Sequence, residues 1–107
     1  MRYFEVYKSG NAEELNRDDF DGAVWSDAYE TAYVELVNEG AIRYWGVDVE
    51  PTQEEYDALG KRAEAVFDDI VATAWVNGYN STNCNEMCLY IMPDDVTVDD
   101  MRGKWHD

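Results

Sequence analysis

The chain has 107 residues, of which 46% are hydrophobic and 14% aromatic, and its 24 acidic and 8 basic side chains give a formal net charge of −16. The apolar and aromatic content excludes a disordered acidic chain, because such chains lack the apolar surface that offsets the entropy of ordering. The length suits one domain, residues 1–107, and the charge argues against direct binding of DNA or RNA, because contacts with phosphates would be repulsive.

The chain opens with an alternating segment. Residues 2–8, RYFEVYK, place Phe4 and Val6 on one side of an extended backbone and tyrosine and glutamate side chains on the other. This period of two predicts a β-strand, and the following SGN predicts a turn. Residues 11–24 show no clear period, so we expect irregular structure there, with at most a short helical turn over NAEEL capped by Asn11.

The segment NRDDFDG, residues 16–22, places three aspartates before a glycine, as a calcium loop does. An EF-hand loop with Gly22 at its sixth position would have Arg17 at the first and Ala28 at the twelfth. Those positions require a carboxylate ligand and a bidentate glutamate. Because two essential ligands are missing, we interpret the segment as an acidic turn and expect no metal site.

A helix is expected to begin after Ser26, a good N-cap, and to end at Gly40. Its apolar side is predicted to carry Ala28, Tyr29, Ala32, Tyr33, Leu36 and Val37. Its solvent side is predicted to carry Asp27, Glu30 and Glu35.

Residues 41–50, AIRYWGVDVE, are rich in β-branched and aromatic residues and predict a second strand that ends before Pro51. Thr52 and Glu55 then form a capping-box pattern at the start of the most regular helix, which is expected to end near residues 77–78. Its apolar stripe is predicted to contain Tyr56, Leu59, Ala63, Val66, Phe67, Ile70 and Ala74.

The remaining segments are a polar loop at 79–86, YNSTNCNE, an apolar strand at 87–92, MCLYIM, and a tail with one helical turn capped by Thr97. The resulting order β-α-β-α-β predicts an α+β fold of two layers. In it, a small three-stranded, mainly antiparallel sheet packs against two helices.

Acidic residues are distributed unevenly along the chain. No lysine or arginine occurs in residues 18–42 or 63–101, although both spans are rich in aspartate and glutamate. On the predicted long helix, Glu54, Asp57, Lys61, Glu64 and Asp68 follow one another at steps of three and four. Neighbours at these steps lie about 5–6 Å apart, close to the spacing of phosphates along a nucleic-acid strand. Such a row can attract a groove whose lysines and arginines neutralise phosphates.

Patterns for catalysis are weak. Acidic doublets recur, but adjacent side chains point apart, so a doublet is not a catalytic carboxylate pair. His106, the one histidine, is the penultimate residue, and there is no G-x-S-x-G, P-loop or dinucleotide motif. We therefore expect no enzyme and no cofactor; a carboxylate-dependent metal hydrolase is the outside alternative.

The two cysteines, Cys84 and Cys88, supply with His106 only three soft ligands, which is too few for a structural zinc site. We expect both to be reduced thiols, with Cys88 in the core beside Leu89 and Ile91. No apolar run approaches membrane-spanning length and no signal-peptide pattern opens the sequence. These features indicate a cytoplasmic protein, in the host cytoplasm if a phage encodes it.

Aromatic residues within an acidic surface can anchor a protein interface, and Trp75 is predicted to share a helix side with Asp57 and Glu64. The predicted partner-binding residues are Asp18, Asp19, Asp21, Glu54, Asp57, Glu64, Asp68, Asp94, Asp95, Asp99, Asp100 and Trp75.

In size, in its pI near 4.1 and in its acidic stripes, the chain is similar in kind to the DNA-mimic inhibitors that phages and mobile elements use against restriction and CRISPR nucleases. The resemblance is one of composition and transfers no functional residue. It implies a protein that blocks the basic nucleic-acid-binding site of a nuclease or a CRISPR or restriction effector. We expect a monomer or homodimer. Two alternatives stay open: a small acidic protein whose charge serves solubility or a saline cytoplasm, and an acidic chaperone or antitoxin-like partner of a basic protein.

Overall fold

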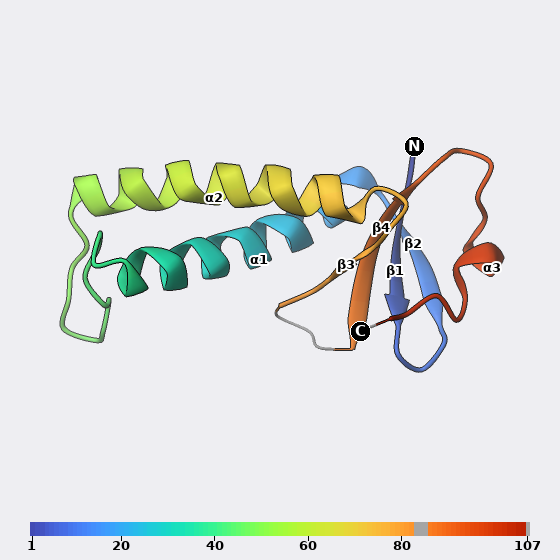
Figure 1. Ribbon diagram of the computed structural model, residues 1–107, viewed down its shortest axis with the longest axis horizontal. Coiled ribbons are helices and arrows are strands. Elements are labelled where there is room, and N and C mark those ends of the chain that lie inside the picture. Colours follow the sequence, from blue (N-terminus) through green and yellow to red (C-terminus); the bar gives the residue numbers. More distant parts are fainter. Residues whose placement is uncertain (83–85, 107) are drawn as a thin grey trace.

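The computed structural model describes residues 1–82 and 86–106. The elements in this part of the chain are β1 (Arg2–Tyr7), β2 (Ala12–Leu15), α1 (Arg17–Asn38), α2 (Gln53–Ala74), β3 (Tyr79–Asn80), β4 (Met87–Met92) and α3 (Val98–Met101). The long helices α1 and α2 lie side by side as an antiparallel hairpin, and the sheet lies at one end of it (Figure 1). The molecule is therefore elongated, with extents of 47 × 24 × 19 Å.

The fold is α+β, as predicted, but the sheet within the described residues has four antiparallel strands in the order β2-β1-β4-β3, not three. Alternation along the strands gives the sheet two apolar faces. Leu89 and Ile91 pack against α1 and α2, whereas Phe4 and Val6 pack against the C-terminal segment that contains α3. The molecule thus has three layers rather than the expected two.

Residues 12–15 are a strand, not the irregular or helical segment expected from NAEEL. Gly10, at φ +98°, turns the chain so that Ala12 pairs with Val6 and Leu15 with Tyr3. The segment is too short to show a period of two, and its strand conformation depends on backbone bonds to β1. Two consecutive glutamates on this edge strand also discourage pairing with a further strand.

Helix α1 begins at Arg17, ten residues before the predicted start after Ser26. The Asn16 side chain caps it by accepting a hydrogen bond from the backbone N–H of Asp19 at 2.7 Å. The helix buries Phe20 near the sheet and Leu36 at its far end. The buried residues of α1 recur at steps of four from Phe20 through Ala28 to Leu36, so the row that was predicted to begin after Ser26 extends back to Phe20. NRDDFDG is therefore the cap and start of a helix, not a turn.

Asp27 is buried at 1% exposure, although the sequence placed it on the solvent side of α1. Its carboxylate accepts hydrogen bonds from the Ser81 hydroxyl at 2.9 Å and from the Thr82 backbone N–H at 3.0 Å. Burial, together with the nearby charge of Asp27, raises the pKa of Tyr79 to about 12. These hydrogen bonds to Asp27 therefore connect the segment after β3 to α1.

We expect Asp27→Ala to lower the free energy of unfolding by about 1–3 kcal/mol, because it leaves a buried hydroxyl and a backbone N–H without their acceptor. The matched control is Glu30→Ala on the exposed side of α1, which should stay within about 0.5 kcal/mol of wild type. Urea denaturation monitored by circular dichroism measures both. Equal stability of the two variants would contradict the structural role of Asp27.

Residues 41–50 do not form the predicted strand. They belong to the loop that joins α1 to α2 at the end of the hairpin remote from the sheet (Figure 1). A strand requires a neighbouring strand for its backbone bonds, and the sheet is at the other end of the molecule. Ile42 is buried in this loop, whereas Tyr44 and Val47 are exposed.

Helix α2 begins as predicted, with Thr52 and Glu55 forming both bonds of the capping box. It ends at Ala74, earlier than expected, because Trp75 is extended and Val76 adopts φ 64° and donates its N–H to the carbonyl of Ile91 at 2.9 Å. Gly78, at φ +82°, lies so close to Tyr90 that a Cβ would be 2.5 Å from that ring.

The C-terminal elements follow the sequence predictions more closely. Strand β4 and the Thr97-capped turn, α3, both form. The expected polar loop at 79–86 contains the short strand β3, and Cys84 lies outside the described residues. Cys88 is buried as expected, but alternation places it on the α3 side with Tyr90 rather than with Leu89 and Ile91. Among the helices described, none is long and apolar enough to cross a membrane.

Candidate partner-binding surface

The predicted acidic residues of α2 form a row on its exposed side. Glu54, Asp57, Glu64 and Asp68, which we call the acidic stripe, are all exposed, and so is Lys61 in their midst. Asp57 accepts a hydrogen bond from Gln53 at 2.8 Å. Within the described residues, Glu64 and Asp68 take part in no ion pair, so their charges are directed to solvent.

Asp18, Asp19 and Asp21 lie in the first turns of α1. Carboxylates at this end of a helix interact favourably with its dipole, and Asp21 also lies 3.6 Å from Arg17. Because the hairpin is antiparallel, this end of α1 adjoins the C-terminal half of α2. Asp21 and Phe67 accordingly line the same small cavity, of about 170 Å³. These aspartates and the acidic stripe therefore belong to one hairpin.

The predicted acidic residues of the tail are placed elsewhere. The C-terminal segment covers the sheet face opposite the hairpin (Figure 1). Asp94 pairs with the N-terminal ammonium group, Asp99 pairs with Arg102, and Asp100 accepts the Thr97 N–H at 2.9 Å in a capping box. The ammonium group lowers the pKa of Asp94, and the bonds from Thr97 lower that of Asp100.

All four tail carboxylates are exposed, but three of them serve local structure, and only Asp95 has no such contact among the described residues. They do not join the acidic stripe in one continuous surface.

Trp75 does not share the helix side of Asp57 and Glu64, as the sequence predicted. It follows the last turn of α2 in an extended conformation and forms an isolated bridge with Ile91 of β4. The helical phase therefore does not extend to it. Its side chain is 43% exposed at the junction of helix and sheet, so it remains accessible.

One side of the hairpin carries aromatic rings, most of which the sequence predicted to lie in buried helix stripes or in a strand. This aromatic face consists of Trp25, Tyr29, Tyr33, Tyr44, Trp45, Tyr56 and Phe67. Trp25 stacks on Phe67 with ring centroids 4.3 Å apart, and Trp45 lies 5.3 Å from Tyr33 and 5.4 Å from Tyr56.

Tyr29, Tyr44 and Tyr56 of the aromatic face are 45%, 71% and 52% exposed. Tyr29 and Tyr56 were expected in the buried stripes of the two helices. The spacing of Trp25, Tyr29 and Tyr33 at steps of four is the signal that could have revealed a continuous row on α1. That the row borders the interhelical contact rather than filling it depends on how α2 docks.

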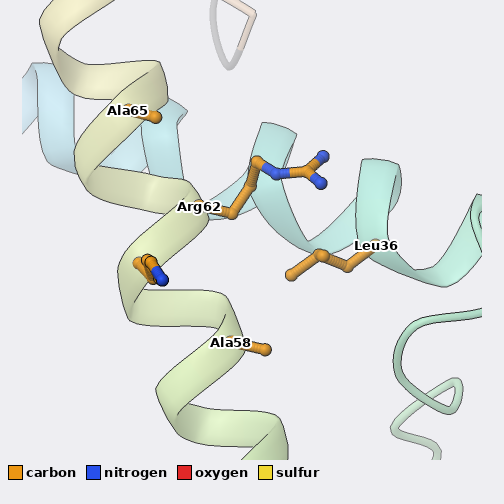
Figure 2. A pocket seen from close by; sticks show the side chains of 5 residues that line it. Leu36, Ala58, Arg62 and Ala65 are labelled. Atoms are coloured by element: carbon orange, nitrogen blue, oxygen red, sulfur yellow. The ribbon is translucent and has the colours of Figure 1, made fainter.

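The other side of the hairpin is held by ion pairs. Arg62 of α2 donates to Glu39 at 2.6 and 2.9 Å and to Glu35 at 3.1 Å, and these bonds raise its pKa. Figure 2 shows its guanidinium group directed toward α1 and Leu36, above an open groove of about 380 Å³ lined by Ala58 and Ala65. One guanidinium thus pairs with both carboxylates on this side and offsets one of their two negative charges.

Glu55 organises the end of the hairpin. Its carboxylate accepts hydrogen bonds from Arg43 at 2.6 and 3.2 Å, from the Thr52 and Arg43 backbone N–H groups at 3.0 Å and from the Trp45 indole at 3.3 Å. The Arg43 guanidinium, followed by the backbone donors, holds the pKa of Glu55 well below its usual range.

Because the pKa of Glu55 is depressed on folding, its contribution to stability is complete above the unfolded pKa of about 4.3 and is lost as the pH falls through the lower folded value. We expect Glu55→Gln to melt well below wild type at pH 7 and by a smaller but still clear margin near pH 3, where protonation of Glu55 in the unfolded chain has removed only part of the stabilisation. Thermal unfolding at both pH values, with Glu54→Gln as the exposed neighbouring control, measures this. An equal difference at both pH values would show that the charge of Glu55 is not involved.

Metal-ligating side chains do not gather in the part of the chain that the structure describes: no group of three or more could hold an ion. His106 is 2.9 Å from the carbonyl oxygen of Asn77 and lies edge-on to Tyr90. Comparison with protein-family models, curated proteins and solved structures gave no match. The function of this surface is therefore inferred from its own residues and their contacts.

Proposed function

We propose that the protein is a non-enzymatic inhibitor that occupies the basic nucleic-acid-binding site of another protein, such as a nuclease or a CRISPR or restriction effector. The single observation that carries this proposal is the acidic stripe. Carboxylates follow one another at helical spacing on the outer side of α2, which packs along α1, and Glu64 and Asp68 have no ion-pair partner among the described residues. A groove of lysines and arginines built for phosphates would be attracted to such a row.

The aromatic face argues against the alternative that the charge serves only solubility. A surface selected for solubility has little reason to expose three tyrosines and Val47 on one part of the molecule. An acidic chaperone or antitoxin-like protein would also bind a basic partner through its negative charge. The two functions differ in whether nucleic acid displaces the protein from its partner.

A halophilic protein should lose its structure in dilute buffer, where screening is weak. We expect this protein instead to keep its circular dichroism spectrum and a cooperative melt at an ionic strength of about 10 mM. Its two apolar clusters and internal ion pairs do not depend on salt for their formation. Unfolding on dilution, reversed by potassium chloride, would favour adaptation to a saline cytoplasm.

The test of the proposed function is competition. Immobilised protein is exposed to the lysate of a candidate host at about 50 mM salt, and captured proteins are challenged with duplex DNA, single-stranded DNA and RNA. We expect nucleic-acid-binding enzymes to be retained, to be released by one of these nucleic acids, and to lose affinity steeply as salt approaches about 200 mM. Captured enzymes that accept nucleic acid while still bound would contradict the proposal.

A further inference from the structure

The rings of the aromatic face carry no charge, so they add nothing to the electrostatic attraction of the acidic stripe. Its exposed tyrosines also lie outside the buried core. Tyr29 and Tyr56 come from different helices and are each about half exposed, while Trp25, Tyr33, Trp45 and Phe67 hold the ring network together from below. Large exposed rings supported by a rigid layer of other rings are typical anchors of protein interfaces.

A glycine interrupts this face, although neither the stability of the helix nor packing inside the molecule requires one there. Gly60 lies in the middle of α2, four residues after Tyr56 and seven before Phe67, and therefore on the same side of the helix. Glycine at such a position destabilises a helix relative to alanine. A Cβ at Gly60 would have no atom within 4 Å, so packing within the molecule does not require its absence. Gly22, one turn before Trp25 on α1, is equally open.

The charges around the face select its partner. Glu64 lies four residues after Gly60 and three before Phe67, so the acidic stripe borders the rings directly. A planar cation placed on the rings would have carboxylates beside it. A second copy of the chain would bring another formal charge of −16 against the first, which opposes self-association through this face.

We propose that the aromatic face, with the bare backbone at Gly60, receives arginine side chains of the basic partner, each guanidinium stacked on a ring and paired with a carboxylate of the acidic stripe. This inference rests on the proposed function and specifies its chemistry. Arginine suits the site because its planar group stacks on aromatic rings and pairs with carboxylates in the same pose, whereas lysine is a hydrated point charge. The rings would then occupy the place that bases take in the partner's groove.

The experiment compares deca-arginine with deca-lysine, two peptides of equal charge, by isothermal titration calorimetry at about 100 mM salt. We expect wild type to prefer deca-arginine by about fivefold or more. Tyr29→Ser combined with Tyr56→Ser should remove this preference and leave deca-lysine binding unchanged. Gly60→Leu should weaken deca-arginine binding, whereas Ala65→Leu, which creates the same side chain beside the groove of Figure 2, should not.

Each outcome separates this inference from the function on which it rests. Equal affinity for both peptides, unaffected by the tyrosine variants, would overturn the stacking role and leave charge-based mimicry in place. Failure of both peptides to bind would overturn the proposed function and this inference with it. Circular dichroism of each variant establishes that the helices are intact, and an equal effect of Gly60→Leu and Ala65→Leu would show that no particular face is used.

Discussion

Replacing Phe20 with alanine should lower the free energy of unfolding by about 3–5 kcal/mol, enough to unfold a large share of the molecules of a domain this small. Phe20 is 1% exposed and is one of the largest fully buried side chains. Its ring packs 4.9 Å from that of Tyr3, at the point where α1 meets the sheet. Truncation leaves a cavity between two layers that are each held by other contacts, so the site cannot collapse easily.

Urea denaturation measures the effect, and Val34→Ala is the matched control, since Val34 is on the same helix but 50% exposed. The control should stay within about 0.5 kcal/mol of wild type. The half-buried Phe67 should show an intermediate loss when changed to alanine. If Phe20→Ala unfolds at the urea concentration of the wild type, the first turns of α1 do not dock on the sheet as described.

Reversing three charges of the acidic stripe, with Asp57→Lys, Glu64→Lys and Asp68→Lys together, should weaken binding to a basic partner by roughly 100-fold or more at 50 mM salt. Juxtaposed like charges cost several kcal/mol, and each 1.4 kcal/mol is a factor of ten. All three side chains are exposed, so the circular dichroism spectrum and melting temperature should remain near those of wild type. Binding of deca-lysine by calorimetry measures the loss without knowledge of the natural partner.

The matched control changes the net charge by the same amount at the sheet end of the molecule, with Glu13→Lys, Glu86→Lys and Asp95→Lys. We expect the fold-loss in affinity of this control to be less than a tenth of the fold-loss of the stripe variant. Equal losses would mean that total charge, and not its arrangement on α2, determines binding. If the stripe variant binds like wild type, another surface must contact the basic partner, and the surface around Trp75 would be the first candidate.

Segments whose structure depends on their own residues were predicted well. Strand β1, the start of α2 and the turn α3 each carry a complete local signal: an alternation, or a Thr cap with an acidic residue three positions later. The exposure of the acidic stripe follows in the same way, because residues three and four apart on a long amphipathic helix share a side.

Segments whose structure depends on a distant neighbour were predicted poorly. Ala12–Leu15 is a strand because β1 supplies its backbone partners, and 41–50 is a loop because no strand reaches it. Asp27 reads as a solvent-facing residue until Ser81 and Thr82 are brought to it from the other side of the chain. Burial of a charge cannot be inferred from helical spacing when the groups that satisfy it lie more than fifty residues away.

The sequence by itself determined that this is a folded, strongly acidic α+β protein with a row of carboxylates along one helix, because composition and helical period are local properties. Only the tertiary structure decided which carboxylates remain available and where the rings gather. The antiparallel docking of α1 on α2 places Glu35 and Glu39 against Arg62 on one side and joins the aromatic residues of both helices on the other. These pairings arise from contacts between residues far apart in the chain, and no local pattern encodes them.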